Sequence, residues 1–176
     1  MLSEGLFGNR VDEFGTIVHQ DWEHYLVHQG EMFSCADVDN DIDNASPKYW
    51  MILTPATAKA HIAISAGLSD AGLFEIYKAP TTSGNGSQLT CQNMKDWSTN
   101  MAVVQVFKDP TVSNDGTLVF ISRLGGAGLG NSQVSGSVRD HTERLINVSS
   151  KYIIKLTPDG DTKKGLLNME YYEEEA

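Results

Sequence analysis

Apolar residues recur at every second position along several segments of this chain, and this periodicity constrains the fold most. The clearest example is ATAKAHIAISAG, residues 56–67. Its alanines favour a helix by intrinsic propensity, but a period of two places successive side chains on opposite faces of an extended strand. A strand with one buried face is therefore predicted. The apolar set is Ala58, Ala60, Ile62 and Ile64, and the alternate set is Lys59, His61, Ala63 and Ser65.

The same kind of pattern predicts strands along most of the chain. Two of the segments, 49–53 and 117–124, are apolar on both faces, which is typical of central strands covered on both sides. No amphipathic helix longer than a turn or two is predicted. The expected strands are residues 22–27, 32–35, 49–53, 58–65, 74–77, 104–106, 117–124 and 142–146, followed by a closing pair at 151–157 and 167–172.

Turn signals separate these strands. Asn85-Gly86 predicts a two-residue turn, Asp115-Gly116 marks another, and residues 124–137 read as a long, mobile glycine- and serine-rich loop. No fixed-period repeat is visible, which argues against a propeller or solenoid. Many short strands with turns between them predict an all-β fold, an antiparallel jelly-roll β-sandwich at residues 22–176 preceded by an extended N-terminal arm at 1–21.

The chain closes on two strand-like runs around the turn residues 158–161, PDGD. We expect these runs to pair as an antiparallel hairpin. Tyr172 should face outward, at a surface or subunit contact, and the glutamates at 173–175 should face solvent and protect the strand end from edge-to-edge association. The side chains expected in the core are Tyr152, Ile154 and Leu156 from the first run and Leu167, Met169 and Tyr171 from the second.

Length, charge and cysteine content limit the classes of function. The 176 residues suit one domain with an arm, and 23 acidic against 13 basic residues give a net charge of −10, which argues against a nucleic-acid partner. No apolar run approaches a membrane span, and acids interrupt any signal-peptide core near the N-terminus. Cys35 and Cys91 fit no metal or redox motif. We expect both cysteines to be buried thiols. A disulfide between them is an alternative, although two unpaired thiols fit synthesis in a reducing compartment better.

An acidic run, DVDNDID, suggests a calcium site. Asp37, Asp39, Asp41 and Asp43 occupy alternate positions, as ligands of an EF-hand loop do. That loop needs glycine at its sixth position and glutamate at its twelfth, where this chain has Ile42 and Lys48. A solvated acidic loop between strands is the favoured interpretation, and a calcium site of another type remains open.

Other chemistry-bearing residues give weaker signals. His24 and His28 would share a strand face with Glu23 and Glu31 nearby, but two histidines without a third ligand indicate surface or interface residues rather than a metal site. The glycine run at 125–130, GGAGLG, is not followed by a helix that would hold a pyrophosphate. No nucleophile motif is present, and a carboxylate pair for glycoside hydrolysis cannot be read from sequence. We therefore predict no catalytic residue, no metal, no cofactor and no enzymatic activity.

Several motifs together resemble one family. They are YKAPT at 77–81 with the following Asn-Gly, DPTVSNDGTL at 109–118, and KYIIKLT at 151–157. The order of these segments, over residues 25–173, is similar to that of tailed-bacteriophage virion proteins described as head decoration or cement proteins with a jelly-roll fold. The resemblance implies no catalytic residues and no cofactor. It implies a virion location on the capsid surface, after synthesis in the host cytoplasm, and the major capsid protein as partner.

Physical arguments agree with these expectations and leave two alternatives. An acidic surface keeps copies apart before they dock, and closed symmetry favours a homo-oligomer, for which we expect a trimer. One alternative is a carbohydrate-binding jelly-roll module of a tail or receptor-binding structure, in which Trp22, Trp50 or Trp97 would stack on sugars, although such tryptophans are more often core residues. The other is a jelly-roll enzyme of unknown chemistry.

Overall fold

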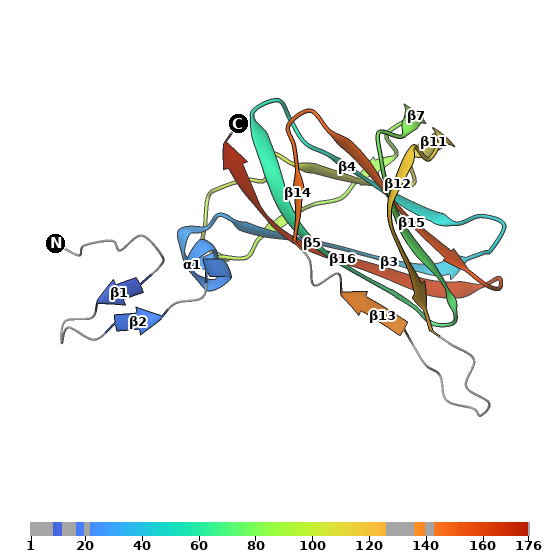
Figure 1. Ribbon diagram of the computed structural model, residues 1–176, viewed down its shortest axis with the longest axis horizontal. Helices are drawn as coiled ribbons and strands as arrows, with labels where there is room; N and C mark the ends of the chain where they lie inside the picture. The colour runs from blue at the N-terminus through green and yellow to red at the C-terminus, as the bar shows by residue number, and fades with distance from the viewer. Residues whose placement is uncertain (1–8, 12–16, 20–21, 126–135, 140–142, 176) are drawn as a thin grey trace.

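The computed structural model describes residues 9–11, 17–19, 22–125, 136–139 and 143–175, and within them it is an all-β sandwich (Figure 1). Two antiparallel sheets pack face to face. Sheet I has the order β13-β5-β16-β3-β9, with β14 also pairing with β5, and sheet II has the order β12-β6-β15-β4-β10-β8. The predicted β-sandwich is confirmed.

The bounds of the strands are as follows. Sheet I contains β3 (Met32–Ile42), β5 (Ala58–Leu68), β9 (Gln92–Asn93), β13 (Gly136–Arg139), β14 (Arg144–Ile146) and β16 (Lys163–Glu175). Sheet II contains β4 (Lys48–Leu53), β6 (Gly72–Lys78), β8 (Ser87–Gln88), β10 (Gln105–Lys108), β12 (Thr117–Leu124) and β15 (Lys151–Pro158). Two further pairs are β1 (Asn9–Val11) with β2 (Ile17–His19), and β7 (Thr81–Gly84) with β11 (Thr111–Asn114).

The strand order follows a simple rule. Strands from the two halves of the chain pair from the outside inward: β3 with β16, β4 with β15, β5 with β13 and β14, and β6 with β12. The doubled chain is then folded over, because β16 also pairs with β5 and β15 also pairs with β6. Each sheet therefore contains strands from both the first and the second half of the sequence.

The main core lies between the sheets and is filled by the side chains at alternate positions of each strand. In β5 the predicted alternation is confirmed, with the even-numbered residues Ala58 to Ile64 buried and the odd-numbered ones half-buried. The predicted core residues of the closing segment are also confirmed: Leu167, Met169 and Tyr171 are buried, as are Ile154 and Leu156, and Tyr152 packs against the same core. Each such fully buried large side chain contributes about 1.5–3 kcal/mol relative to exposure.

A second, smaller core covers the outer face of sheet II. Met51 and Ile153 are fully buried there beside Phe107, and Val112 of β11 packs onto them. This outer core explains why the segment 49–53, now β4, is apolar on both faces, as predicted for a strand covered on both sides. The paired strands β7 and β11, which we call the ribbon, form the cover.

The ribbon is made by two similar sequences. Two similar segments are residues 77–87, YKAPTTSGNGS, and residues 107–117, FKDPTVSNDGT. Both begin with an aromatic residue followed by Lys-x-Pro-Thr-x-Ser, and both end in glycine followed by a serine or threonine. The copies pair crosswise: β7 with β11, β6 with β12, and β8 with β10. The residue before each proline, Ala79 or Asp109, has a positive φ, of 53° and 56°. A fixed-period repeat of many copies would be visible in the sequence, whereas these are only two copies, which the structure joins.

Each copy needs its glycine to fit the other copy. Gly86 and Gly116 have φ of 83° and 92°, in the region that L side chains rarely adopt. A Cβ on Gly86 would lie 2.1 Å from the carbonyl oxygen of Lys108, and one on Gly116 would lie 2.3 Å from that of Lys78. The predicted Asn-Gly turn at 85–86 is thus a crossing from the ribbon into sheet II, because β7 and β8 do not pair with each other.

Residues 22–27 are helical, so the strand predicted there is wrong. The helix α1 (Trp22–Gln29) ends in a Schellman motif: the Gly30 amide donates to the Val27 carbonyl at 3.0 Å, and the Glu31 amide donates to Leu26 at 3.0 Å. Gly30 takes the positive φ, 75°, that this cap requires. This glycine, just after the segment, was the signal that the sequence reading missed.

The closing strands do not form the predicted hairpin. β15 lies in sheet II between β4 and β6, whereas β16 lies in sheet I between β3 and β5. The residues between Pro158 and Lys163 therefore cross from one sheet to the other. Alternation identified the buried face of each strand correctly, but two strands that face each other across a core show the same alternation as two that pair within one sheet.

Three further predictions concern the segment 117–124, the N-terminal arm and the glycine loop. The segment 117–124, expected to be central, is the edge strand β12, and Leu118 and Ile121 are 44% and 52% exposed. The arm at 1–21 lies mostly outside the described residues, apart from the short pair β1 and β2, and so does most of the glycine loop at 124–137. Whether the arm and the 22–176 domain are independent units stays a prediction.

Candidate functional site

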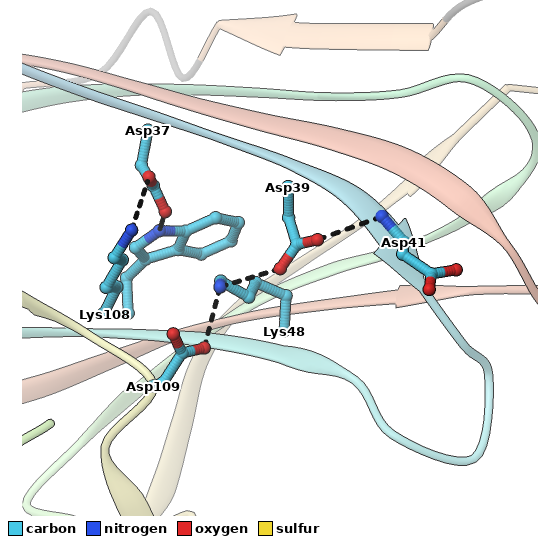
Figure 2. A network of polar contacts seen from close by, with 7 residues as sticks. Asp37, Asp39, Asp41, Lys48, Lys108 and Asp109 are labelled. Atoms are coloured by element: carbon cyan, nitrogen blue, oxygen red, sulfur yellow. Dashed lines mark hydrogen bonds and ion pairs between the residues drawn. The ribbon is translucent and has the colours of Figure 1, made fainter. Parts of the chain in front are cut away.

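The densest polar cluster joins the edges of the two sheets, where β3 faces β4 and the end of β10 (Figure 2). β3 starts with Phe33 and Cys35 in the main core, and the same face continues with Asp37 and Asp39. The acidic run is therefore strand up to Ile42, and the predicted loop is wrong over these residues. The carboxylates of Asp37 and Asp39 point toward lysines of sheet II.

Asp37 fixes the indole of a core tryptophan. The indole Nε1 of Trp50, a side chain with no exposed surface, donates to the Asp37 carboxylate at 2.8 Å. The ammonium of Lys108 lies 3.6 Å from the other oxygen of this carboxylate. A buried indole N–H needs an acceptor, so Asp37 supplies one at the rim of the core, and Trp50 is unavailable for stacking on a sugar.

Lys48 bridges two carboxylates. Its ammonium lies 2.8 Å from an oxygen of Asp39 and 2.7 Å from one of Asp109, and its side chain is only 9% exposed. Burial alone would lower the pKa of Lys48, but the hydrogen bonds to Asp109 and Asp39 raise it above its ordinary value. The hydrogen bond from Lys48 in turn lowers the pKa of Asp39. Lys48 and Asp39 are thus both ionised around neutral pH.

This arrangement supports the sandwich and does not favour a calcium site. The position between Asp39 and Asp109 that a cation would take is filled by the Lys48 ammonium (Figure 2). Asp43 instead accepts a hydrogen bond from the Thr162 amide at 2.9 Å. Among the described residues no group of three histidine, cysteine or acidic side chains is placed to hold a metal ion. Asp109 also belongs to the turn that enters the ribbon, so the cluster links β3, β4 and the ribbon.

The two histidines lie on α1 and not on a strand. Because they are four residues apart on a helix, their Nε2 atoms come within 3.0 Å, and both rings are exposed. On a helix, residues at i and i+4 are neighbours, whereas on the predicted strand the two histidines would share a face but lie about 13 Å apart, at roughly 3.3 Å per residue. Glu23 and Glu31 do not complete a ligand set with them within the described part of the chain.

A cavity of about 570 Å³ lies along the segment 88–104, which connects β8, β9 and β10. Its lining is rich in amide and hydroxyl groups, including Asn93, Asn100 and Thr90. The Asn93 and Asn100 side chains donate to the Gly30 carbonyl at 2.8 and 3.0 Å, which ties the segment to the end of α1. Trp97 in this segment is 78% exposed. The side chain of Trp22 lies outside the described residues.

Glu173 holds the same segment from the other side. Its carboxylate accepts from the backbone amides of Val103 and Val104 at 2.9 and 2.8 Å, and burial raises its pKa despite these bonds. The prediction that this glutamate faces solvent is therefore wrong. Glu174 and Glu175 are exposed, within β16, as expected. Tyr172 lies on the outer face, half-buried, with its ring stacked 4.3 Å from that of His61.

Comparison with known proteins adds no family assignment: no protein-family model matches this sequence, and no curated protein matches it significantly. In the described part of the chain, no helix has the length and apolar character needed to cross a membrane. The residues of the site must therefore be interpreted from their own chemistry.

Proposed function

We propose that this chain is a virion structural protein, a capsid decoration or cement protein with a jelly-roll sandwich. The strand order carries the proposal. Pairing from the outside inward, with the doubled chain folded across two sheets, is what two Greek keys produce in a jelly roll. The motifs that resemble head decoration proteins lie in this framework, since the two KxPT motifs lead into the strands of the ribbon and KYIIKLT lies in β15.

The polar chemistry supports a structural role. The Lys48 and Asp37 contacts engage carboxylates in ion pairs and an indole hydrogen bond that join strands of the two sheets. The surface offers contacts suited to protein partners: Met94, Trp97 and Met101 are 40%, 78% and 84% exposed along one connecting segment. Exposed aromatic and methionine side chains are enriched at such interfaces.

In this proposal the partner is the major capsid protein, the location is the outside of the capsid, and copies associate as a homo-oligomer, with a trimer favoured. Neither nucleic acid, membrane nor cofactor is needed. The test is quantitative mass spectrometry on purified particles of the phage that carries the gene, with copies counted relative to the major capsid protein. Hundreds of copies support a decoration protein, a handful indicate a tail component, and absence from the particle overturns the proposal.

One observation favours carbohydrate binding as a second candidate. Trp97 is exposed between Asp96 and Ser98, which both line the amide-rich cavity, and an aromatic platform next to amide groups suits a sugar ring. Glycan-array binding that is lost in Trp97→Ala would support this function. Met94→Ala is the matched control, because it removes an exposed apolar side chain of the same segment but no aromatic ring. Equal binding by both variants and the parent chain would exclude Trp97 as the platform.

A further inference from the structure

The two cysteines, 56 positions apart in the sequence, meet at the edge of sheet I. β3 and β9 are antiparallel, with Phe33 opposite Asn93 and Ser34 opposite Gln92. One more step in this register places Cys35 opposite Cys91. Opposed residues of antiparallel strands have Cα atoms about 4.5–5.5 Å apart, within the range of roughly 4.4–6.8 Å that a disulfide requires.

The side chains also lie on the same face. Cys35 is 3% exposed in the main core, and Cys91 is partly buried and packs against that core. Both are thiols in this structure, and each is close enough to the other to shift its pKa. Cys91 also lines the cavity along residues 88–104, which gives a small oxidant a route to it. Register, side-chain direction and access therefore agree.

The surroundings make the two thiols unequal. The hydrogen bond from Cys35 lowers the pKa of Cys91 to about 7, whereas the same contact and burial raise the pKa of Cys35. The Tyr171 hydroxyl, which makes no hydrogen bond of normal geometry to a described residue, is close enough to lower the pKa of Cys91 further. The more accessible cysteine is thus the one that reaches the reactive thiolate form near neutral pH.

We propose that Cys35 and Cys91 form a cross-strand disulfide when the protein meets a low-molecular-weight disulfide. The Cys91 thiolate attacks one sulfur of the oxidant and releases the first thiolate as leaving group. Cys35 then loses its proton to that thiolate or to water, attacks the Cys91 sulfur and releases the second thiolate. The net change oxidises two protein thiols to one disulfide and reduces one small disulfide to two thiols.

The bond changes how firmly the segment 88–104 is held. β9 is only two residues long, and it is the edge strand that attaches this segment to sheet I. A disulfide next to it closes a loop of more than fifty residues, which restricts the unfolded chain strongly. It also fixes the wall of the cavity, because the segment that carries Trp97 is then covalently attached to β3. The inference does not depend on the function proposed above.

The direct test compares the full-length chain after treatment with oxidised or reduced glutathione. Free thiols are blocked with an alkylating reagent, and the protein is digested with trypsin. The tryptic peptides 11–48 and 79–95 each hold one cysteine. Oxidation should join them within a monomer. Disulfide-linked dimers alone, or a stable glutathione adduct on Cys91 with Cys35 still free, would overturn the proposal.

Thermal unfolding supplies an independent measurement. Oxidation should raise the midpoint of the parent chain by on the order of 10 °C, from the size of the closed loop. Cys91→Ser is the matched variant, because it removes the accessible thiol and leaves the buried one. Its midpoint should be the same in both glutathione forms. Equal midpoints for the oxidised and reduced parent chain would show that no stabilising bond forms.

Discussion

The outer faces of the two sheets differ sharply. On sheet II, Met51 and Ile153 are fully buried under the ribbon. On sheet I, Val38 and its neighbour Leu166 on the adjacent strand are 62% and 38% exposed. Within the described residues, no segment covers these two side chains as the ribbon covers sheet II. Both faces belong to antiparallel strands of one sandwich, so strand pairing alone does not decide which outward-facing residues are buried.

The difference comes from what lies on each face. The outer face of sheet I carries small side chains around a shallow hollow of about 280 Å³, including Ala36, Ala63 and Ser65. The outer face of sheet II carries large apolar residues and two lysines. Lys151 donates to the Thr82 hydroxyl of the ribbon at 2.8 Å, and Lys155 donates at 2.9 Å to the carboxylate of Asp115, the residue that follows β11. The ribbon thus forms a third layer of the protein, on the outer face of sheet II.

The largest difference should appear when an aspartate is placed on the covered face of sheet II and, for comparison, on the exposed face of sheet I. Ile153→Asp would bury a carboxylate under the ribbon without a partner, and we expect a loss of about 4 kcal/mol or more in the free energy of unfolding. Val38→Asp, on the exposed face, should change it by less than about 0.5 kcal/mol. Urea unfolding monitored by circular dichroism measures both. Similar losses would mean that the outer face of sheet I is also covered.

The second prediction concerns the glycines that lock the ribbon. Gly116→Ala needs a left-handed conformation and places a Cβ 2.3 Å from the Lys78 carbonyl oxygen, so we expect a loss of about 2 kcal/mol or more. Gly84→Ala, whose Cβ would meet its nearest neighbour at 3.5 Å, is the control and should cost less than about 1 kcal/mol. Unfolding midpoints that are equal in the two variants would show that the crosswise fit carries no weight.

The third prediction tests how the cluster at the sheet edges anchors the ribbon. Lys48→Met leaves Asp39 and Asp109 without their shared cation, and we expect a loss of about 1–2 kcal/mol, since both carboxylates keep some solvent. Lys108→Met, which removes a longer and more exposed contact, should cost less than about 0.5 kcal/mol. Calorimetry of the two variants decides; the reverse order of stability would contradict the role given to Lys48.

The smallest effect should appear on acidification. The pKa of Asp39 is lowered by the hydrogen bond from Lys48, so its contribution is present above the unfolded pKa and is lost as the pH falls through the folded one. Thermal midpoints measured from neutral pH down to about pH 3 should therefore decline less steeply in Asp39→Asn than in the parent chain. Parallel curves would remove Asp39 from the acid response.

Much of the fold could be predicted because alternation records burial directly. The buried parity of β5, the doubly covered β4 and the core side chains of β15 and β16 all follow from it. Alternation does not record which strand is the neighbour, so β15 and β16 were placed in one sheet. The helix α1 was missed because its pattern is short, and its cap depends on Gly30, outside the segment.

The candidate site was harder to predict for a physical reason. Asp37 and Asp39 were singled out by sequence, but their partners lie in other strands, and the sequence contains no measure of that distance. Lys48 was noted only as the wrong residue for a calcium loop, although its ammonium takes the place that a cation would have occupied. Glu173 was read as part of an acidic end, because backbone amides as partners leave no trace in sequence.

The pairing of β3 with β16 has a consequence for how the protein is made. Ribosomes deliver the chain from its N-terminus at about 5–20 residues per second, and β3 emerges more than 100 residues before its partner β16. Sheet I cannot be completed until β16 has also been synthesised, so β3 has to wait for this partner strand. Native contacts between such distant residues also slow the folding step itself. During that interval the nascent strands have unpaired edges, and the acidic charge of the chain opposes their association.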